Sequence, residues 1–364
     1  MPLTKVQSRG TENVGQGSSN VIINGAMNLA QRGTSSTGIG ASDGYFVCDR
    51  WYLDSGATTA GRLTMTQDSS APSGFANSLK VACTTADTSI ASGEQLLIQQ
   101  RIEGQNLQAF AKGTSDAKEF AVSFYVKGNA SATYICELHD QDNGRQCSKT
   151  FSVTTDWTRI ELIFPADTTG AFDDDNDRSL NFNIALHAGA TYTSGTLNSS
   201  AFATTNNNNR YVGGSSFFDS TSRTFFITGV QIEVGSQVSD FQHEDFGTTL
   251  AKCQRYFFAV GFPDKLASSV NFAMGYYLNS ARVDCVIDLP VTMRTTPSVI
   301  ASSGTNHFDA YMNGSDYFDT FDAINSASAN SFTIYRSSQI SGTAGDAVLI
   351  SKSSSASLTA SAEL

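Results

Sequence analysis

The chain has 364 residues, of which 40% are hydrophobic and only 16% are charged, so it can form real cores and exceeds the usual size of one domain. Its formal net charge of -11 repels phosphate backbones, which argues against nucleic-acid binding. No apolar stretch approaches the roughly 20 residues of a membrane span, so no membrane insertion is expected. The six cysteines are scattered without a C-x-x-C pair, and we expect buried free thiols.

Residues 1–20 are polar, and their aliphatic side chains are Leu3, Val6 and Val14. Such a segment cannot bury enough apolar surface to offset the entropy lost on ordering, so it is expected to be disordered when alone. It is either a floppy terminus or a peptide that becomes ordered only against another protein, by strand addition or by docking into a groove.

Between Asn20 and Phe246, apolar residues alternate with polar residues in several separate segments. The clearest of these segments are 120–126, 160–164, 180–186 and 230–234. One apolar face per strand is typical of antiparallel sheets packed face to face. Turn residues such as those at 142–144 separate the segments, and long helical periodicity is absent. The pattern predicts an all-β jelly-roll sandwich.

Two segments of this region are expected to form loops. Residues 173–177 contain four carboxylates, and residues 192–216 are nearly all small or polar. The acidic segment matches alternate ligand positions of an EF-hand, but Arg178 and Ile184 replace the required glycine and glutamate, so that interpretation fails. The acidic segment is then either a site for a structural ion of another kind or a solvated loop. Long polar loops on a sandwich are where binding surfaces usually lie.

A second β-rich module follows Phe246. The sequence predicts a short helix over 248–255, with Thr248 or Thr249 as its N-cap. Met293 and Arg294 are expected to form an edge strand that the following proline ends. Alternation predicts three further strands, within 283–289, 332–334 and 348–350.

Six short motifs occur in order along the chain: Ile22–Gly25, Gln31–Thr34, Asp49–Trp51, Phe241–Gly247, Cys253–Phe257 and Pro290–Pro297. Together they resemble a family of bacteriophage tail-fibre and receptor-binding virion proteins. The resemblance implies an N-terminal virion-attachment peptide (1–20), then a jelly-roll β-sandwich like that of carbohydrate-binding modules (21–247). A smaller C-terminal β-sandwich (248–364) would form the tip module.

The same resemblance implies a location and partners. The protein would be made in the host cytoplasm and carried on the tail of the virion, where residues 1–20 would attach to a tail, nozzle or adaptor protein. The expected anchor residues are Pro2, Leu3, Val6 and Val14. The resemblance also implies a homotrimer that adsorbs to host surface polysaccharide, and a final strand closed by Ala362–Leu364.

The arginines of the N-terminal motifs have two interpretations. Each lies among other polar groups, as in a binding site. The structural interpretation is favoured, in which an arginine stacks on Trp51 and bonds the Asp49 carboxylate. In the later motif, the aromatic side chains of Tyr256 and Phe257 are expected to be buried, with Arg255 satisfying nearby carbonyls.

Carbohydrate binding requires flat apolar faces edged by hydrogen-bonding groups. The best local match is Phe308–Asp322, where aromatic residues are interleaved with carboxylates and an amide. The receptor-binding candidates are Tyr311, Asn313, Asp316, Tyr317, Phe318 and Asp319. The alternative is a strand–turn–strand whose rings pack in the core of the module.

Catalytic signals are thin, because the sequence has no G-x-S-x-G elbow, H-E-x-x-H pair or phosphate loop. We therefore expect no enzyme, no catalytic residue, no metal and no cofactor. The predicted function is a phage tail fibre that adsorbs to host surface glycans. A capsid decoration or head-fibre protein is the first alternative. A glycan depolymerase is the second, since carboxylates can converge in three dimensions.

Overall fold

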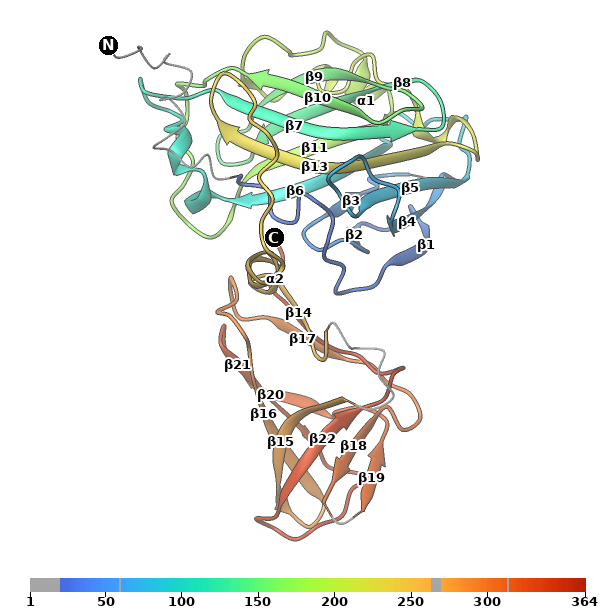
Figure 1. Ribbon diagram of the computed structural model, residues 1–364, viewed down its shortest axis with the longest axis vertical. Coiled ribbons are helices and arrows are strands. Elements are labelled where there is room, and N and C mark those ends of the chain that lie inside the picture. Colours follow the sequence, from blue (N-terminus) through green and yellow to red (C-terminus); the bar gives the residue numbers. More distant parts are fainter. Residues whose placement is uncertain (1–19, 59, 263–269, 313) are drawn as a thin grey trace, which may run out of the picture. The chain divides into compact units, whose positions relative to one another are not determined.

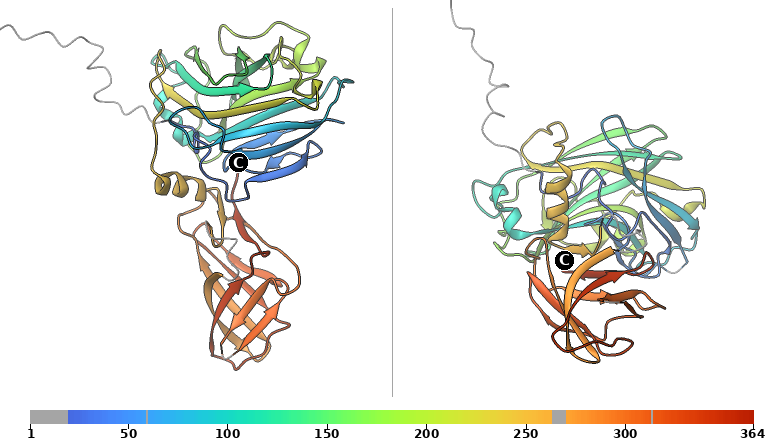
Figure 2. Two further views of the ribbon diagram at one scale, coloured as in Figure 1. Left: turned by 45° about the vertical axis from the view of Figure 1, so that its right-hand side comes forward. Right: turned by 60° about the horizontal axis from the view of Figure 1, so that its bottom comes forward.

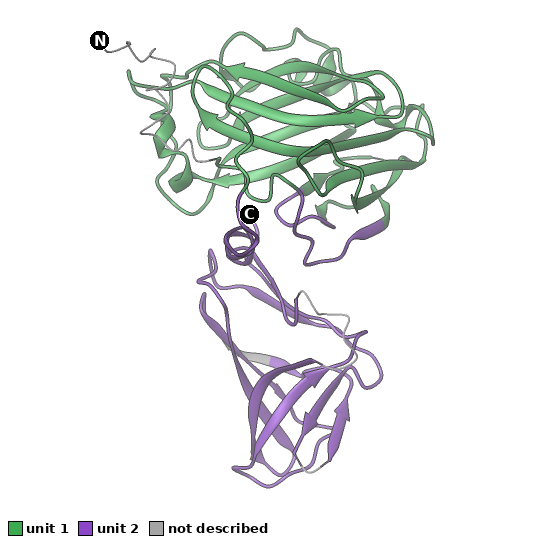
Figure 3. Ribbon diagram, viewed as in Figure 1, with its two compact units in different colours: residues 1–26, 37–44, 52–243 green, residues 27–36, 45–51, 244–364 purple. Residues whose placement is uncertain are grey.

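The structure is a computed structural model that describes residues 20–58, 60–262, 270–312 and 314–364. The chain forms two compact units (Figure 3). Unit 1 contains Thr37–Gly44, Tyr52–His243 and the described part of Met1–Ala26, and unit 2 contains Met27–Ser36, Tyr45–Trp51 and Glu244–Leu364. The predicted ranges 21–247 and 248–364 are each continuous, whereas unit 2 includes two segments from the first. The expected anchor residues Pro2, Leu3, Val6 and Val14 lie outside the described residues.

Unit 1 is built on two sheets (Figures 1 and 2). Among the described residues, the six-stranded sheet has the order β1-β4-β5-β13-β7-β10, and the seven-stranded sheet has the order β12-β9-β8-β11-β6-β3-β2. Their strands are β1 (Ser35–Ile39), β2 (Gly44–Tyr45), β3 (Tyr52–Asp54), β4 (Arg62–Asp68), β5 (Ser78–Thr85), β6 (Gln95–Glu103), β7 (Phe120–Gly128), β8 (Ala132–Asp140), β9 (Arg145–Val153), β10 (Thr158–Phe164), β11 (Arg178–Ala188), β12 (Ala203–Thr204) and β13 (Thr224–Val234). Each pair with a described register is antiparallel. One short helix, α1 (Ala190–Thr193), follows β11.

The core of unit 1 lies between these sheets, where one face of each strand is apolar. Phe120, Val122 and Phe124 on β7 are fully buried. The ring of Phe124 packs edge-on against Phe151 and Phe182 of the other sheet, with ring centroids 5.1 and 6.1 Å apart. The strands predicted within 120–126, 160–164, 180–186 and 230–234 are confirmed as parts of β7, β10, β11 and β13. The alternating pattern therefore predicted which side chains meet in the core.

The turn predicted at 142–144 is confirmed, because it joins β8 to β9. All six cysteines are free and buried, as predicted. Burial raises the pKa of the Cys147 thiol to about 11, so this side chain is a neutral apolar group at physiological pH.

Unit 2 contains a three-stranded sheet of order β14-β23-β17 and a seven-stranded sheet of order β19-β18-β22-β15-β16-β21-β20 among the described residues. Their strands are β14 (Phe257–Ala259), β15 (Val270–Asn279), β16 (Arg282–Asp288), β17 (Ser298–Ala301), β18 (Phe308–Tyr311), β19 (Ser315–Phe318), β20 (Ala323–Ala327), β21 (Ser331–Arg336), β22 (Ala347–Lys352) and β23 (Leu358–Ser361). Helix α2 (Phe246–Gln254) precedes them. The core includes Tyr277, Phe308, Phe332 and Ile350.

The strands predicted within 283–289, 332–334 and 348–350 are confirmed as β16, β21 and β22. The predicted fold class is also confirmed: an all-β chain with a β-sandwich followed by a smaller β-rich module.

The arginines of the N-terminal motifs lie in unit 2, where they contact residues of the C-terminal part of the chain. The guanidinium of Arg32 lies 3.5 Å from the ring centroid of Phe257, and that of Arg50 lies 3.4 Å from the centroid of Tyr256. Both arginines also pair with Glu363, next to the last residue. Stacking and charge pairing together hold Arg32 and Arg50 against residues 256–257 and Glu363.

The structural interpretation of these motifs is thus supported, and the predicted ion pair of an arginine with Asp49 is confirmed. Trp51 is fully buried, and the stacking of an arginine on its ring stays a prediction. The Asp49 carboxylate accepts hydrogen bonds from the backbone and side-chain amides of Gln31, at 3.1 and 2.8 Å. Arg32 lies farther from Asp49, at 3.6 Å. Tyr256 and Phe257 are buried, as predicted.

Three local predictions in unit 2 need correction. Helix α2 begins at Phe246, and its N-cap is Asp245, whose carboxylate accepts from the amide of Thr248 at 2.9 Å. The expected edge strand at Met293 is absent from the described structure. Met293 is buried in the core, and its amide donates to the carbonyl of Ala329 at 2.8 Å. The prolines on either side, Pro290 and Pro297, have no amide hydrogen to donate to a neighbouring strand.

The final strand, β23, ends at Ser361 and not within Ala362–Leu364. The amide of Ala362 instead donates to the carbonyl of Tyr256 at 2.7 Å. The end of the chain is therefore fixed by this bond and by the arginine pairs of Glu363.

Candidate functional site

The predicted receptor-binding segment forms a β-hairpin of unit 2, made by β18 and β19. Its register pairs Asp309 with Tyr317 and Tyr311 with Ser315, which places all four on one face of the sheet. Tyr311 and Tyr317 are 51% and 53% exposed. These two rings are the candidates that the hairpin presents outward.

The other described candidates are used within the protein. Phe318 is fully buried, and its ring packs against those of Phe308 and Phe321 at 5.7 and 5.1 Å. It was wrong to group this side chain with Tyr317, because neighbours along a strand point to opposite faces. Asp316 accepts hydrogen bonds from the Tyr277 hydroxyl at 3.0 Å and from a backbone amide at 2.8 Å.

Asp319 is likewise engaged, because it accepts from the amide of Asn306 at 3.0 Å and from the side chain of Gln339 at 3.1 Å. These hydrogen bonds lower the pKa of Asp319 below its usual value. Asn313 lies outside the described residues. The hairpin therefore offers two exposed rings but no free carboxylate among the described candidates to pair with them.

A second polar surface lies in unit 1, on the outer face of the seven-stranded sheet. In the register of β6, β11 and β8, Asn183 pairs with Gln99 on one side and with Glu137 on the other. One step along β11, Asn181 pairs with Arg101 and with His139 in the same way. Two adjacent rows of hydrogen-bonding side chains thus cross the middle of the sheet.

A continuous chain of hydrogen bonds runs along the first row and is joined to Arg101 of the second row. The Arg101 Nε atom donates to Gln99 at 2.6 Å, the Gln99 amide donates to Asn183 at 2.8 Å, and the Asn183 amide donates to Glu137 at 2.8 Å. Arg210 then donates to both oxygens of Glu137, at 2.8 and 2.7 Å. Because each member fixes the next, the chain holds Arg101 in one orientation.

The long polar loop predicted at 192–216 contributes to this surface. Arg210 and Tyr211 come from it, and the Tyr211 hydroxyl donates to Glu137 at 3.1 Å. Burial alone would raise the pKa of Glu137, but the charge and hydrogen bonds of Arg210 bring it below its usual value. Glu137 is therefore an ionised structural anchor at neutral pH and not a general acid.

The second row carries an unused acceptor. Asn181 is only 4% exposed, and its Oδ1 atom has no hydrogen-bond partner among the described residues. Beside it, the His139 ring contacts the Thr205 hydroxyl at 3.1 Å, and burial lowers the pKa of this histidine, so it is neutral at pH 7. An unsatisfied buried acceptor costs about 1–3 kcal/mol, which a hydrogen-bond donor from outside would recover.

An aromatic ring borders these rows. Tyr52 on β3 pairs with Gln99 and lies on the same outer face. The guanidinium of Arg101 covers its ring at 3.6 Å from the centroid. Both side chains are half-buried. The surface therefore combines cationic donors, a buried amide acceptor without a partner among the described residues, and an apolar ring.

Sequence reasoning missed this surface. The outward positions of β6, β8 and β11 are polar at alternate residues, which was a usable signal within each strand. Their convergence depends on pairing between strands about 40 to 80 residues apart, which the pattern of one strand does not contain.

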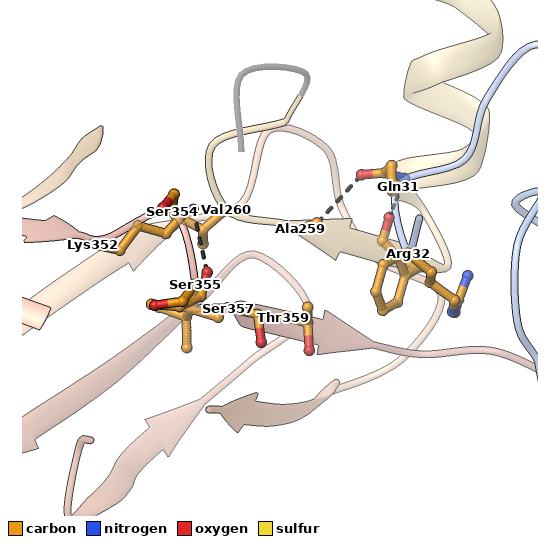
Figure 4. A pocket seen from close by; sticks show the side chains of 12 residues that line it. Gln31, Arg32, Ala259, Val260, Lys352, Ser354, Ser355, Ser357 and Thr359 are labelled. Carbon is orange, nitrogen blue, oxygen red and sulfur yellow. Dashed lines mark hydrogen bonds between the residues drawn. The ribbon is translucent and has the colours of Figure 1, made fainter. Parts of the chain in front are cut away.

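Unit 2 also contains a pocket of about 310 Å³ (Figure 4). It is lined by Gln31, Arg32, Phe257, Ala259, Val260, Lys352 and residues 354–359. The Gln31 side chain bonds to the backbone of Phe257 and Ala259, at 2.8 and 3.3 Å. Because its strongest donors already have partners in the protein, we assign this pocket a structural role.

The described residues contain no group of three or more His, Cys, Asp or Glu side chains that could hold a metal ion. In the acidic segment, the side chain of Asp175 accepts from the amide of Asp177 at 2.9 Å. As for helices, none in the described part of the chain has both the length and the apolar character needed to cross a membrane.

No family model and no curated protein sequence matches the chain. Among similar solved structures is TmCBM61 in complex with β-1,4-galactotriose, with 10% identity, a TM-score of 0.32, and coverage of 60% of this chain and 99% of that chain. A family 11 carbohydrate-binding module from Clostridium thermocellum, in complex with a β-1,3-1,4-mixed-linked tetrasaccharide, has 14% identity, a TM-score of 0.27, and coverage of 58% and 98%.

The enzymatically active domain of Bacteriophage CBA120 tailspike protein 4 has 11% identity and a TM-score of 0.29, with coverage of 59% of this chain and 21% of that chain. At such identities and TM-scores the structural similarity is distant, and it assigns the chain to no family.

Proposed function

We propose that this protein is a virion protein that binds polysaccharide without cleaving it, through the outer face of the seven-stranded sheet of unit 1. The observation that carries this proposal is the buried Asn181 Oδ1 atom, which lacks a partner among the described residues, beside the ordered Arg101.

The chemistry of this surface suits a polyhydroxylated ligand. Sugar hydroxyls both donate and accept, so one ligand can donate to Asn181 and accept from Arg101. The ring of Tyr52 offers an apolar edge to the sugar ring. Since the hydrogen-bonded chain through Glu137 already orders Arg101, binding would lose little side-chain entropy.

For the whole particle, we propose a tail fibre. Residues 1–20 would attach the protein to the tail, and the glycan would be a polysaccharide of the host surface. The motif order from Ile22 to Pro297 supports this placement, since it resembles that of phage tail fibres. The same modules would also serve a capsid decoration or head-fibre protein. Labelling purified virions with an antibody to this chain distinguishes the two, because label on the head excludes the tail fibre.

A non-enzymatic role fits the state of the polar surface. Its carboxylate, Glu137, is held by Arg210 and is not free to transfer a proton. Incubation of the protein with host polysaccharide should leave the chain length unchanged. Shortened chains would establish the glycan depolymerase instead.

The binding site is tested with two variants and one control. Arg101→Ala should weaken binding to host polysaccharide by about tenfold or more, as expected for a hydrogen bond to a charged group. Asn181→Ala should also weaken binding, while leaving the protein at least as stable, because it removes an unsatisfied buried acceptor. Arg159→Ala is the matched control, since this half-buried arginine lies on β10 of the other sheet.

Affinity electrophoresis or calorimetry gives the binding constants, and thermal melting gives the stability. If both variants bind as tightly as the wild type, the outer face of the seven-stranded sheet is not the glycan site. If Asn181→Ala destabilises the protein without affecting binding, the Asn181 side chain has a structural role only.

A further inference from the structure

The outer face of the six-stranded sheet of unit 1 carries a row of aromatic and cationic side chains. On β13, Phe226 pairs with Lys80 of β5 on one side and with Lys127 of β7 on the other. Trp157 immediately precedes β10, and the register of β10 with β7 places it beside Lys127. We call these four residues the aromatic–lysine row. It crosses four neighbouring strands of the sheet (Figure 1).

The side chains of the row are in contact with one another. The Nζ atoms of Lys80 and Lys127 lie 5.2 and 5.7 Å from the centroid of the Phe226 ring. The Trp157 ring meets Phe226 edge-on, with centroids 6.1 Å apart. Phe226 is only 8% exposed, because these neighbours cover it, whereas Lys127 and Trp157 are half-buried. The row therefore offers an ammonium group next to an indole ring.

The two lysines of the row differ in their ionic partners. Lys80 pairs with the carboxylate of Asp68 at 3.2 Å. Lys127 has no ion pair with a carboxylate in the described part of the chain. A carboxylate from outside can therefore bind Lys127 without displacing one of the protein's own.

The carboxylates on the six strands of this sheet already have partners. Asp68 pairs with Lys80, Glu161 pairs with Arg159 at 3.1 Å, and Glu233 accepts from the amide of Ser239 at 2.6 Å. Asp156, in the turn before β10, is exposed, so water and salt screen its charge. The net charge of the chain is thus a weak obstacle to an anionic group at this row.

The aromatic surface continues one row further along β7. There Tyr125 lies under the ring of Phe75, with centroids 5.4 Å apart. Arg159 pairs with Tyr125 in the register, but its guanidinium donates to the carbonyl of Ser239 and pairs with Glu161. This second row therefore adds apolar area for a longer ligand, and its cation is already engaged.

A sugar that carries a carboxylate matches the chemistry of the row. The flat indole of Trp157 suits the apolar face of a sugar ring. The ammonium of Lys127 suits a carboxylate on the same ring, because a hydrogen bond between two charged groups is stronger than one between neutral groups. A neutral sugar would use only the first of these features.

We propose that the aromatic–lysine row binds a uronate, an acidic sugar, with the carboxylate on Lys127 and the sugar ring on Trp157. This site goes beyond the polysaccharide surface around Asn181, which lies on the other sheet of unit 1. Each of the two sites can fail without the other.

Tryptophan fluorescence reports on this site directly. The other tryptophan of the chain, Trp51, is fully buried in unit 2, so a stacked sugar should change the emission of Trp157 alone. Trigalacturonate should give a saturable change. Its trimethyl ester, which has the same rings without the charges, should bind at least about tenfold more weakly, as expected when a hydrogen bond between charged groups is lost.

Two variants and one control locate the site. Lys127→Met should weaken trigalacturonate binding at least about tenfold without changing the melting temperature. Lys149→Met is the matched control and should bind as the wild type does. Lys149 is also half-buried, and its Nζ also lies 5.7 Å from a phenylalanine centroid, that of Phe164, but it belongs to β9 of the other sheet. Arg101→Ala should leave the Trp157 response unchanged, which separates this site from the surface around Asn181.

Several results would overturn the proposal. These are a wild type without a saturable response, equal affinity for the acid and its ester, and wild-type affinity in Lys127→Met. A lower melting temperature with unchanged affinity in that variant would make Lys127 only a cover for Phe226. Triglutamate carries carboxylates without sugar rings, and equal affinity for it would assign the row to acidic peptides instead.

Discussion

Two neighbouring aromatic residues of the β18–β19 hairpin should respond to truncation in opposite ways. Phe318 is fully buried against Phe308 and Phe321, so Phe318→Ala should lower the free energy of unfolding by about 3–5 kcal/mol. Tyr317 is 53% exposed on the other face, and Tyr317→Ala should change it by no more than about 0.5 kcal/mol. With a urea dependence near 2 kcal/mol per molar, the first change lowers the midpoint by about 2 M.

The two tryptophans of the chain allow unit 2 to be followed alone. Trp51 belongs to unit 2 and is fully buried, while Trp157 belongs to unit 1. In a Trp157→Phe background, the emission shift on urea addition reports the unfolding of unit 2.

The refuting result is a similar midpoint for the two variants. If Tyr317→Ala were as destabilising as Phe318→Ala, the register that separates their faces would be incorrect.

Further predictions concern unit 2 and the thiols. Burial raises the pKa of Asp49 to about 6 from an ordinary value of 3.8, so between about pH 4 and 6 the folded state holds a proton that the unfolded state has released. The free energy of unfolding should therefore fall as the pH rises through this window, by on the order of 3 kcal/mol from this group, and Asp49→Asn should remove that slope in urea titrations. Glu363→Gln should cost about 3–5 kcal/mol in the same assay at pH 7, because it leaves the buried Arg50 without its anionic partner; an unchanged midpoint would contradict this. Maleimide should modify no cysteine of the native wild type and all six after denaturation, as counted by mass spectrometry.

The strands of this protein could be predicted from sequence because their side chains repeat with the period of the structure. In 120–126 every second residue is apolar, and the same residues are buried in β7. The error at Phe318 came from treating adjacent aromatic residues as one cluster. Strand alternation alone would have separated it from Tyr317.

The pairing between distant segments was not predictable in the same way. Arg50 stacks on Tyr256, about 200 residues away, and any buried aromatic ring would have satisfied the sequence pattern equally well. Likewise, Asn181 meets Arg101 only through the register of β11 with β6. A strand shows which of its residues face outward, but the sheet determines which outward residues become neighbours.

The two outer sheet faces therefore support different kinds of contact from the same strand geometry. In unit 1 the outward residues around Asn181 are linked by hydrogen bonds, which suits a ligand rich in hydroxyl groups. In unit 2 several outward residues around Met274 are large and apolar, which does not suit such a ligand. The polysaccharide site is therefore expected on unit 1, where ordered polar side chains can replace the water that a sugar loses on binding.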